Sequence, residues 1–284
     1  MYIPRYWANE TQHVIAPSGK AFALKCWRGS NTSLEEARHL AKDAITAIAQ
    51  NVRTAQQLDR YSYGERPMRE EVLDVIHNQE GAEVAILTRN KYGALVLNTA
   101  NVMFIDIDFA RDAPAARLSV LLRNLFGQPA TEPAQKYLES IESWARARPD
   151  WAIRVYRTRA GLRCLVTHDV FDPTLESTSI LLKSLQCDPL YMLLCRNQGC
   201  FRARLTPKPW RCGAPRPPSS YPWENQDVEW KYRQWEKRYE QMGSKFATCK
   251  LVKEIGPSHV HPNAEIVRSL HDHYACSSTD LKLA

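Results

Sequence analysis

The sequence predicts an α+β fold in which pairs of strands pack under helices, as opposed to a doubly wound parallel sheet. Strand-like runs follow one another closely at 83–89, 94–99 and 102–109, and the turn residues Asn90, Gly93 and Asn98 separate them. Helical stretches come next, followed by a second pair of strand-like runs at 151–158 and 162–168. Strands that follow each other through short turns are typical of antiparallel pairing.

The N-terminal third is expected to hold a strand pair followed by helices. Residues 21–27 are strand-like. Ser33 and Glu36 form a capping box, in which two side chains satisfy free backbone N–H groups at the start of a helix, and this helix is expected to cover 34–52. A turn is expected at 61–67 and a second helix at 69–77.

The rest of the chain alternates helices with strands. Helices are expected at 113–126, 134–147 and 174–185, and a short one begins at Asp188, a cap residue followed by Pro189. Strands are expected at 201–207 and 246–255, and a Pro- and Ser-rich loop lies at 213–222. Apolar residues spaced four and three apart from Val228 to Met242 predict a docked helix, and a last helix is expected at 263–274.

This order of elements describes a sheet of the RNA-recognition-motif kind with packed helices and helical additions. It divides the chain into three expected parts: an N-terminal strand and helix region at 1–80 packed on the core, the core itself at 81–215, and a C-terminal helical extension at 216–284.

The composition of the chain is that of a globular protein with a real core. Of the 284 residues, 44% are hydrophobic and 24% are charged. No apolar run approaches the ~18 residues that span a bilayer, and the first residues lack a secretory pattern, so a cytoplasmic protein without membrane contact is expected. In that compartment the eight cysteines are expected to be reduced thiols.

Positive charge is concentrated in one segment, from Trp151 to Arg216. The chain carries 38 Lys and Arg against 31 Asp and Glu, a net charge of +7, and this segment accounts for the whole excess. Its cations are mostly arginines, whose forked guanidinium matches phosphate. The segment therefore favours a polyanionic partner, either nucleic acid or nucleoside triphosphate, over a merely solvated basic surface. The cations are Arg154, Arg157, Arg159, Arg163, Lys183, Arg196, Arg202, Arg204, Lys208, Arg211 and Arg216.

Two carboxylates mark the end of the strand expected at 102–109. Asp106 and Asp108 are two apart, so both point to one face of the strand while Ile105 and Ile107 point to the other. Two like charges this close raise each other's pKa unless a cation neutralises them, and hard oxygen ligands suit Mg²⁺ or Mn²⁺. The alternatives are a solvated acidic pair or one acid paired with an arginine.

A basic hairpin and a third cluster follow. Arg157, Arg159 and Arg163 alternate along the hairpin and are expected to share a face, and Gly161 is expected to let the backbone approach a ligand. The third cluster begins at the lone acid Asp188 and ends with alternating cations on the strand expected at 201–207.

Together these clusters resemble the archaeo-eukaryotic primase superfamily, and its PrimPol-like branch in particular. The first motif of that family is an Asp-x-Asp on a strand, which Asp106 and Asp108 match. The second ends in a His that contacts the incoming nucleotide, and Arg163 stands at that position here. The third has an Asp, a Tyr and an Arg-Asn-x-x-Phe-Arg run that ends in Ser or Lys. The residues that match it, with a longer spacing after the Tyr, are Asp188, Tyr191, Arg196, Asn197, Phe201, Arg202 and Lys208.

The resemblance covers about residues 83–210 and implies a primase-type, RRM-like core that performs template-associated nucleotidyl transfer. It implies that Asp106, Asp108 and Asp188 hold two Mg²⁺ or Mn²⁺ ions, which activate a 3′-hydroxyl and stabilise the leaving pyrophosphate. The implied partners are nucleoside triphosphates and single-stranded nucleic acid. The residues implied to bind the triphosphate are Arg163, Arg202 and Lys208, with Arg159 and Arg204 beside them.

Three other functions are compatible with the sequence. A non-catalytic nucleic-acid-binding protein of the same fold would use the basic segment without needing all three carboxylates. A metal-dependent nuclease would use the same groups with water as the nucleophile. An interaction protein would present Trp223, Trp230 and Trp235 to a partner.

Two further metal sites are weaker. The spacing of the cysteines from Cys187 to Cys212 lacks the short pairs that are typical of zinc sites, and buried thiols are expected there. The histidines from His259 to His273, with Cys276, are better explained by the polar ends of a helix.

Overall fold

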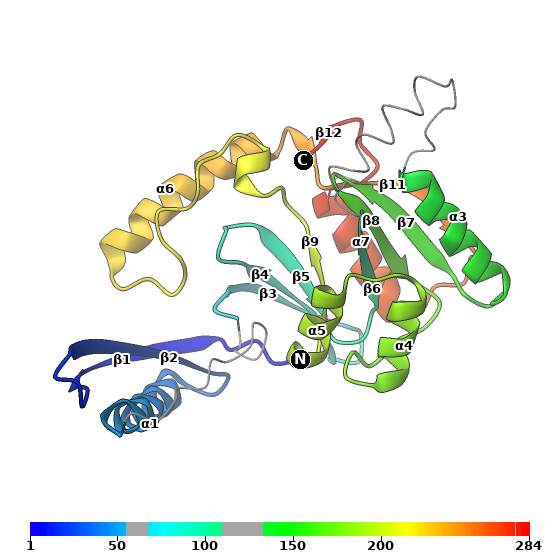
Figure 1. Ribbon diagram of the computed structural model, residues 1–284. Helices are drawn as coiled ribbons and strands as arrows, with labels where there is room; N and C mark the ends of the chain where they lie inside the picture. The colour runs from blue at the N-terminus through cyan, green and yellow to red at the C-terminus, as the bar shows by residue number, and fades with distance from the viewer. Residues whose placement is uncertain (55–67, 110–132, 276) are drawn as a thin grey trace, which may run out of the picture.

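The computed structural model describes residues 1–54, 68–109, 133–275 and 277–284 of the chain (Figure 1). The turn expected at 61–67 and the helix expected at 113–126 lie outside the described residues. The rest is a mixed α+β structure built on antiparallel sheets, as the element order predicts.

The N-terminal unit is a long hairpin with one helix packed on it. Strands β1 (Tyr6–Ile15) and β2 (Ala21–Ser30) pair antiparallel, and α1 (Leu34–Arg53) packs against both of them. The hydroxyl of Ser33 accepts from the backbone N–H of Glu36 at 3.1 Å, so the expected cap begins this helix. In Figure 1 the unit extends away from the two larger sheets.

The first of the larger sheets has the strand order β3-β4-β5-β9. Its strands are β3 (Glu71–His77), β4 (Glu83–Arg89), β5 (Leu95–Thr99) and β9 (Phe201–Arg204). The helix predicted at 69–77 was wrong, because β3 pairs with β4 along its whole length. The register shifts between Val72 and Asp74 and again at Ile76, and these irregularities break the alternation of apolar residues that would have identified a strand.

The second sheet has the order β11-β7-β8-β6. Its strands are β6 (Phe104–Asp108), β7 (Ile153–Thr158), β8 (Gly161–Val166) and β11 (Cys249–Ile255). Strand β8 lies between β6 and β7, although the chain passes from β6 through α3 (Pro133–Arg146) to β7 before it forms β8. The result is a split β-α-β arrangement, in which the strand that follows the crossover is separated from the first by a third.

One hydrophobic core joins the two sheets and most of the helices. It contains the apolar faces of β4, β6, β7 and β8, with residues of α3, α4 (Glu176–Ser184), α5 (Pro189–Gln198) and α7 (Pro262–Ala275). The boundary expected at residue 80 falls between β3 and β4, which pair in one sheet. The boundary expected at residue 215 also divides a sheet, because β11 from the C-terminal part pairs with β7 of the core. The short strands β10 (Phe246–Ala247) and β12 (Lys282–Leu283) pair in parallel near the chain end.

Helix α6 (Gln226–Gly243) forms a second, smaller aromatic core. Trp235 and Tyr239 stack at 5.1 Å and are buried with Tyr232, so Trp235 belongs to the interior and not to a partner-binding face. Trp223 packs on the same cluster, and only Trp230 of the three tryptophans considered above is largely exposed, at 63%. The helix is tied to β3 and β4 by ion pairs from Arg233 and Arg89.

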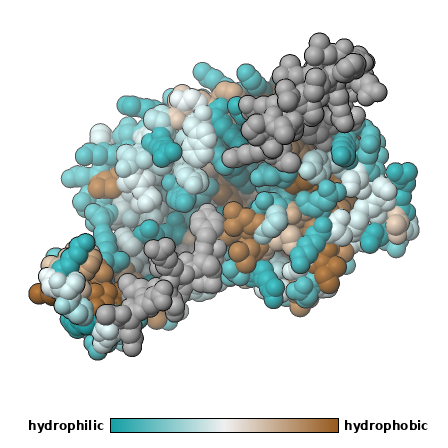
Figure 2. Space-filling view, in the orientation of Figure 1, coloured by the Kyte–Doolittle hydropathy of each residue, from teal (hydrophilic) through white to brown (hydrophobic). Residues whose placement is uncertain are grey.

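Figure 2 shows one face that is largely hydrophilic, with small hydrophobic groups scattered over it. In the described ranges, no helix is both long and apolar enough to cross a membrane.

Gly161 gives the first test of this packing. A Cβ at residue 161 would lie 2.0 Å from the carbonyl oxygen of Ile107 on β6. The neighbouring strand, and not a ligand, therefore explains this glycine.

We expect Gly161→Ala to lower the free energy of unfolding by about 1–3 kcal/mol, since the added atom must displace backbone. Gly243→Ala is the matched control, because its Cβ would meet its nearest neighbour, Pro207, at 3.8 Å. Equal stability of the two variants in urea would contradict the packing described.

Candidate functional site

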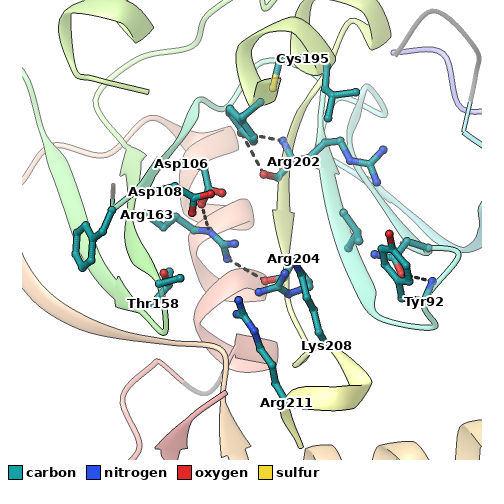
Figure 3. A pocket seen from close by; sticks show the side chains of 16 residues that line it. Tyr92, Asp106, Asp108, Thr158, Arg163, Cys195, Arg202, Arg204, Lys208 and Arg211 are labelled. Carbon is teal, nitrogen blue, oxygen red and sulfur yellow. Dashed lines mark hydrogen bonds and ion pairs between the residues drawn. The ribbon is translucent and has the colours of Figure 1, made fainter. Parts of the chain in front are cut away.

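A cavity of about 500 Å³ opens between the two larger sheets (Figure 3). Strand β6 and the β7–β8 hairpin form one wall, and β9 with the turn after it forms the other. The β4–β5 turn and helix α5 complete the lining. The charged residues that line the cavity are Asp106, Asp108, Arg163, Arg202, Arg204, Lys208 and Arg211.

Asp106 and Asp108 lie on one face of β6, as their spacing predicts. Asp106 is partly buried and stands opposite Arg163 of β8 in the antiparallel register, while Asp108 is exposed and stands opposite Gly161. Residues opposite each other in a ladder share a face of the sheet. Arg163 therefore points to the same side as both carboxylates.

The register corrects one expectation about the hairpin. Tyr156 is the partner of Arg163 across β7 and β8, and Arg157 is the partner of Leu162. Arg157 consequently points to the opposite face from Arg163, where its guanidinium lies 4.6 Å from the ring centre of Phe109 and donates to the carbonyl of Gly161. The three arginines of the hairpin do not share a face.

Asp188 lies beside the carboxylate pair although it is remote in sequence. Its backbone N–H donates to the carbonyl oxygen of Asp106 at 2.8 Å. Its carboxylate caps α5, accepting from the N–H of Tyr191 at 2.7 Å. The structure thus brings the third predicted acid next to the first two, with one of its oxygens already used as a helix cap.

The electrostatics of Asp108 reflect this proximity. Although Asp108 is exposed, its carboxyl is partly desolvated in the cavity wall; this partial burial, together with the negative charges of Asp106 and Asp188, raises the pKa of the carboxyl, and Lys208 and Arg211 oppose the rise. Neighbouring like charges are the arrangement that a bound cation would relieve.

Tyr191 and Arg163 bridge the edge strands of the two sheets, β6 and β9. The buried hydroxyl of Tyr191 contacts the carbonyl of Phe104 on β6 at 3.2 Å, and it also contacts the carbonyl and the N–H of Arg202 on β9. The guanidinium of Arg163 donates to the carbonyl of Arg204 at 2.9 Å, and its Nε lies 3.8 Å from the carboxylate of Asp106. It also contacts the ring of buried His271 at 3.4 Å.

Arg202 is committed to the interior and not to a ligand. Its guanidinium donates to both oxygens of Glu70 at 2.8 and 2.9 Å, and the two side chains are only 12% and 5% exposed. Glu70 also accepts from the hydroxyl of Thr88. Arg202 therefore holds the segment before β3 against β9, and a role in binding triphosphate would require breaking this buried pair.

Three cations, Arg204, Lys208 and Arg211, face the cavity, and none of them forms an ion pair within the described residues. Burial, with the like charges of Arg163 and Arg211, lowers the pKa of Arg204 to about 10, and the Nε of Arg204 is buried without a hydrogen-bond partner in the described part of the chain. Burial and neighbouring cations also lower the pKa values of Lys208 and Arg211. Figure 3 shows all three converging below the carboxylates.

Arg211 was missed by the sequence analysis, and Arg159 lies at the margin of the site. Lys208 precedes the 3₁₀ turn η1 (Pro209–Arg211) and Arg211 ends it, and residues three apart in such a turn lie one above the other. That spacing within the basic segment could have identified Arg211. Arg159 is exposed in the β7–β8 turn and does not line the cavity.

The donor chemistry of the site fits a hard divalent cation, although the side chains are not gathered into a finished metal site. Asp106 and Asp108 offer carboxylate oxygens on one face of β6, and Asp188 is adjacent. Within the residues described, no group of three or more His, Cys, Asp and Glu is arranged to hold a metal ion, and Cys276 lies outside those residues. The cysteines from Cys187 to Cys212 are buried, free thiols.

Comparisons with known proteins give no relative: no family model, no curated protein and no solved structure matches this chain.

The interior role of Arg202 has a direct test in stability. We expect Arg202→Met to lower the free energy of unfolding by about 3–5 kcal/mol, because it leaves the Glu70 carboxylate buried without its partner. Adding Glu70→Gln should restore part of the loss, since the amide carries no charge to bury. Denaturant unfolding of the single and double variants measures both effects. An unchanged midpoint in Arg202→Met would show that the cation is free.

The ionised carboxyl of Asp108 is expected to lower the free energy of unfolding when no cation is bound. Its pKa is higher in the folded chain than the ordinary 3.8, so its ionisation opposes folding at neutral pH, and that cost disappears as the pH falls below both values. Asp108→Asn should therefore raise the melting temperature at pH 7, and the gain should vanish near pH 3. The exposed Asp150→Asn is the control. A variant less stable than the wild type at pH 7 would contradict this electrostatic picture.

Proposed function

We propose that this protein catalyses nucleotidyl transfer of the primase and polymerase type, with nucleoside triphosphate as substrate and single-stranded nucleic acid as template. The observation that carries the proposal is the cavity between the sheets. It has carboxylates on one wall and the cations Arg204, Lys208 and Arg211 on the other. A triphosphate needs both, a basic surface for its charge and acidic groups that can recruit Mg²⁺ or Mn²⁺.

Asp106 and Asp108 would hold the divalent ions, with Asp188 as the third ligand. Bound there, the ions would supply Lewis-acid activation of a 3′-hydroxyl and charge neutralisation at the leaving pyrophosphate. The protein's own contribution is placement. The cap at Asp188 and its N–H bond to Asp106 fix that acid against β6, and the ladder fixes Asp106 and Asp108 side by side.

The cations would bind and orient the triphosphate. Arg204 is held in place by β9, and it forms no ion pair with an acid of the described residues, so binding a phosphate would compensate the cost of its burial. Lys208 and Arg211 extend the same surface from the 3₁₀ turn. Arg163 is hydrogen-bonded to the carbonyl of Arg204 on β9 and lies 3.8 Å from Asp106, so it is better suited to fix the distance between acids and cations than to move with a substrate.

The fold offers limited support for an RRM-like core. The β6-α3-β7-β8 run, with β8 between β6 and β7, is the split arrangement that such cores share. The fourth strand, β11, extends the sheet beside β7, so β6 remains an edge. That free edge is where Asp188 and Tyr191 attach.

A second candidate, a nucleic-acid-binding protein without catalysis, is favoured by one specific observation. Asp106 already has a cationic neighbour in Arg163, whose Nε lies 3.8 Å away. If that contact tightened into an ion pair, Asp106 would be neutralised without a metal, and the cations alone would bind a strand.

The test is nucleotide incorporation by the purified protein with labelled nucleoside triphosphates, single-stranded DNA with and without a primer, and Mg²⁺ or Mn²⁺. We expect metal-dependent products that Asp106→Asn/Asp108→Asn abolishes and that Asp150→Asn leaves unchanged. Lys208→Ala and Arg211→Ala should each weaken triphosphate affinity about 10- to 100-fold, because a hydrogen bond to a charged group contributes about 1.5–3 kcal/mol. Lys183→Ala, an exposed cation of the same basic segment, is the control.

The other outcomes separate the alternatives. Shortened DNA without triphosphate would identify a nuclease. Absence of product, combined with strand binding that survives Asp106→Asn/Asp108→Asn, would replace the proposal with the non-catalytic binder. Mn²⁺ should raise the melting temperature of the wild type and not that of the double variant, which tests the metal site without any activity measurement.

A further inference from the structure

The 3₁₀ turn that carries two cavity cations also carries an exposed tryptophan. Lys208 and Arg211 line the cavity, while Trp210 between them is 48% exposed and is not part of the cavity lining. The turn is anchored without the indole, because Pro209 and Cys212 are the buried residues there. Packing in the core therefore does not explain a tryptophan at this position.

Trp210 is held in place by a second aromatic residue that faces the cavity. Its ring lies 5.3 Å from that of Tyr92 with an angle of 89°, an edge-to-face contact, and Tyr92 lines the cavity. The ammonium of Lys208 is 5.7 Å from the centre of the indole. An aromatic surface and a cation thus lie next to each other at the rim.

The turn that presents Tyr92 is rigid. The side chain of Asn90 accepts from the N–H groups of Tyr92 and Ala94 at 3.0 and 3.1 Å. Gly93 has φ +81°, and a Cβ there would lie 2.3 Å from the ring of Trp235. Because the small core of α6 fixes the turn from behind, the aromatic rim is preorganised and little entropy is lost when a ligand stacks on it.

We propose that Trp210, held by its edge-to-face contact with Tyr92, forms a stacking platform for a nucleobase of the single strand that leaves the cavity. The inference rests on the proposed function for the identity of the strand. Sites for single strands combine cations that follow the phosphates with aromatic rings that stack on the bases, and Lys208, Trp210 and Arg211 supply both from one turn. Trp210 does not line the cavity that the triphosphate would fill, so we assign the base that stacks on it to a neighbouring nucleotide of the strand.

The test measures strand affinity by fluorescence anisotropy, without triphosphate or divalent metal, so that catalysis plays no part. We expect Trp210→Ala to weaken binding of a single-stranded oligonucleotide about 5- to 100-fold, since stacking contributes about 1–3 kcal/mol per base. Trp210→Phe should retain most of the affinity. Trp230→Ala is the matched control, because Trp230 on α6 is even more exposed than Trp210. Equal melting temperatures confirm that the variants are folded.

Two signatures identify stacking. An abasic strand of the same length should bind wild type and Trp210→Ala equally, because it has no base to stack. The slope of log affinity against log salt should be the same in both proteins, whereas Lys208→Ala should reduce it by about 0.7. Unchanged affinity in Trp210→Ala, or a loss that is equal for the abasic strand, would overturn the inference.

Failure of the inference and failure of the proposed function are distinguishable. If the protein incorporates nucleotides and Trp210→Ala leaves strand affinity unchanged, the proposed function stands and the stacking platform is refuted. If Trp210→Ala weakens strand binding and the protein incorporates no nucleotide, the stacking platform stands and the proposed function is refuted. A loss of triphosphate affinity in Trp210→Ala, with strand affinity unchanged, would place the incoming base at the rim and overturn the inference as stated.

Discussion

The site depends on one junction, where the edge strands of two sheets meet through side chains. Strands β6 and β9 each lie at the edge of their own sheet, so each has backbone groups that no further strand of the described residues satisfies. Side chains satisfy some of these backbone groups instead. The hydroxyl of Tyr191 contacts the carbonyls of Phe104 on β6 and Arg202 on β9, and the guanidinium of Arg163 donates to the carbonyl of Arg204. The junction sets the distance between the acids of β6 and the cations of β9, and hence the width of the cavity.

The charged residues of the basic segment divide into those that are already paired and those that are not. Arg202 is neutralised by Glu70, and Arg154 by Glu254 and Asp272, so these contribute to the structure. Burial is the main reason that the pKa values of Arg204, Lys208 and Arg211 are lowered, and neighbouring cations add to the effect, which Asp106 and Asp108 oppose only in part. Groups held in such unfavourable surroundings are typical of binding sites, because the ligand supplies the missing charge.

The sequence predicted those features that depend on interactions between residues close together in the chain. The cap at Ser33, the shared face of Asp106 and Asp108, and the cap at Asp188 each depend on residues a few positions apart. The strand β3 was mistaken for a helix because shifts in its register hide the alternation of its apolar residues. The part played by Arg202 could not be foreseen, since its partner Glu70 lies 132 positions away in the chain. Arg157 and Arg163 point to opposite faces of the sheet because of the register between β7 and β8, which is fixed only in the folded hairpin.

The central claim is that acids and cations on opposite walls of one cavity bind a metal–triphosphate pair. A crystal structure with Mn²⁺ and a non-hydrolysable nucleoside triphosphate tests it most directly, because manganese can be located by its anomalous scattering. The account predicts manganese at Asp106 and Asp108, with the phosphates against Arg204, Lys208 and Arg211. Phosphates bound elsewhere, or a cavity in which Arg163 closes on Asp106 and no manganese appears, would contradict it.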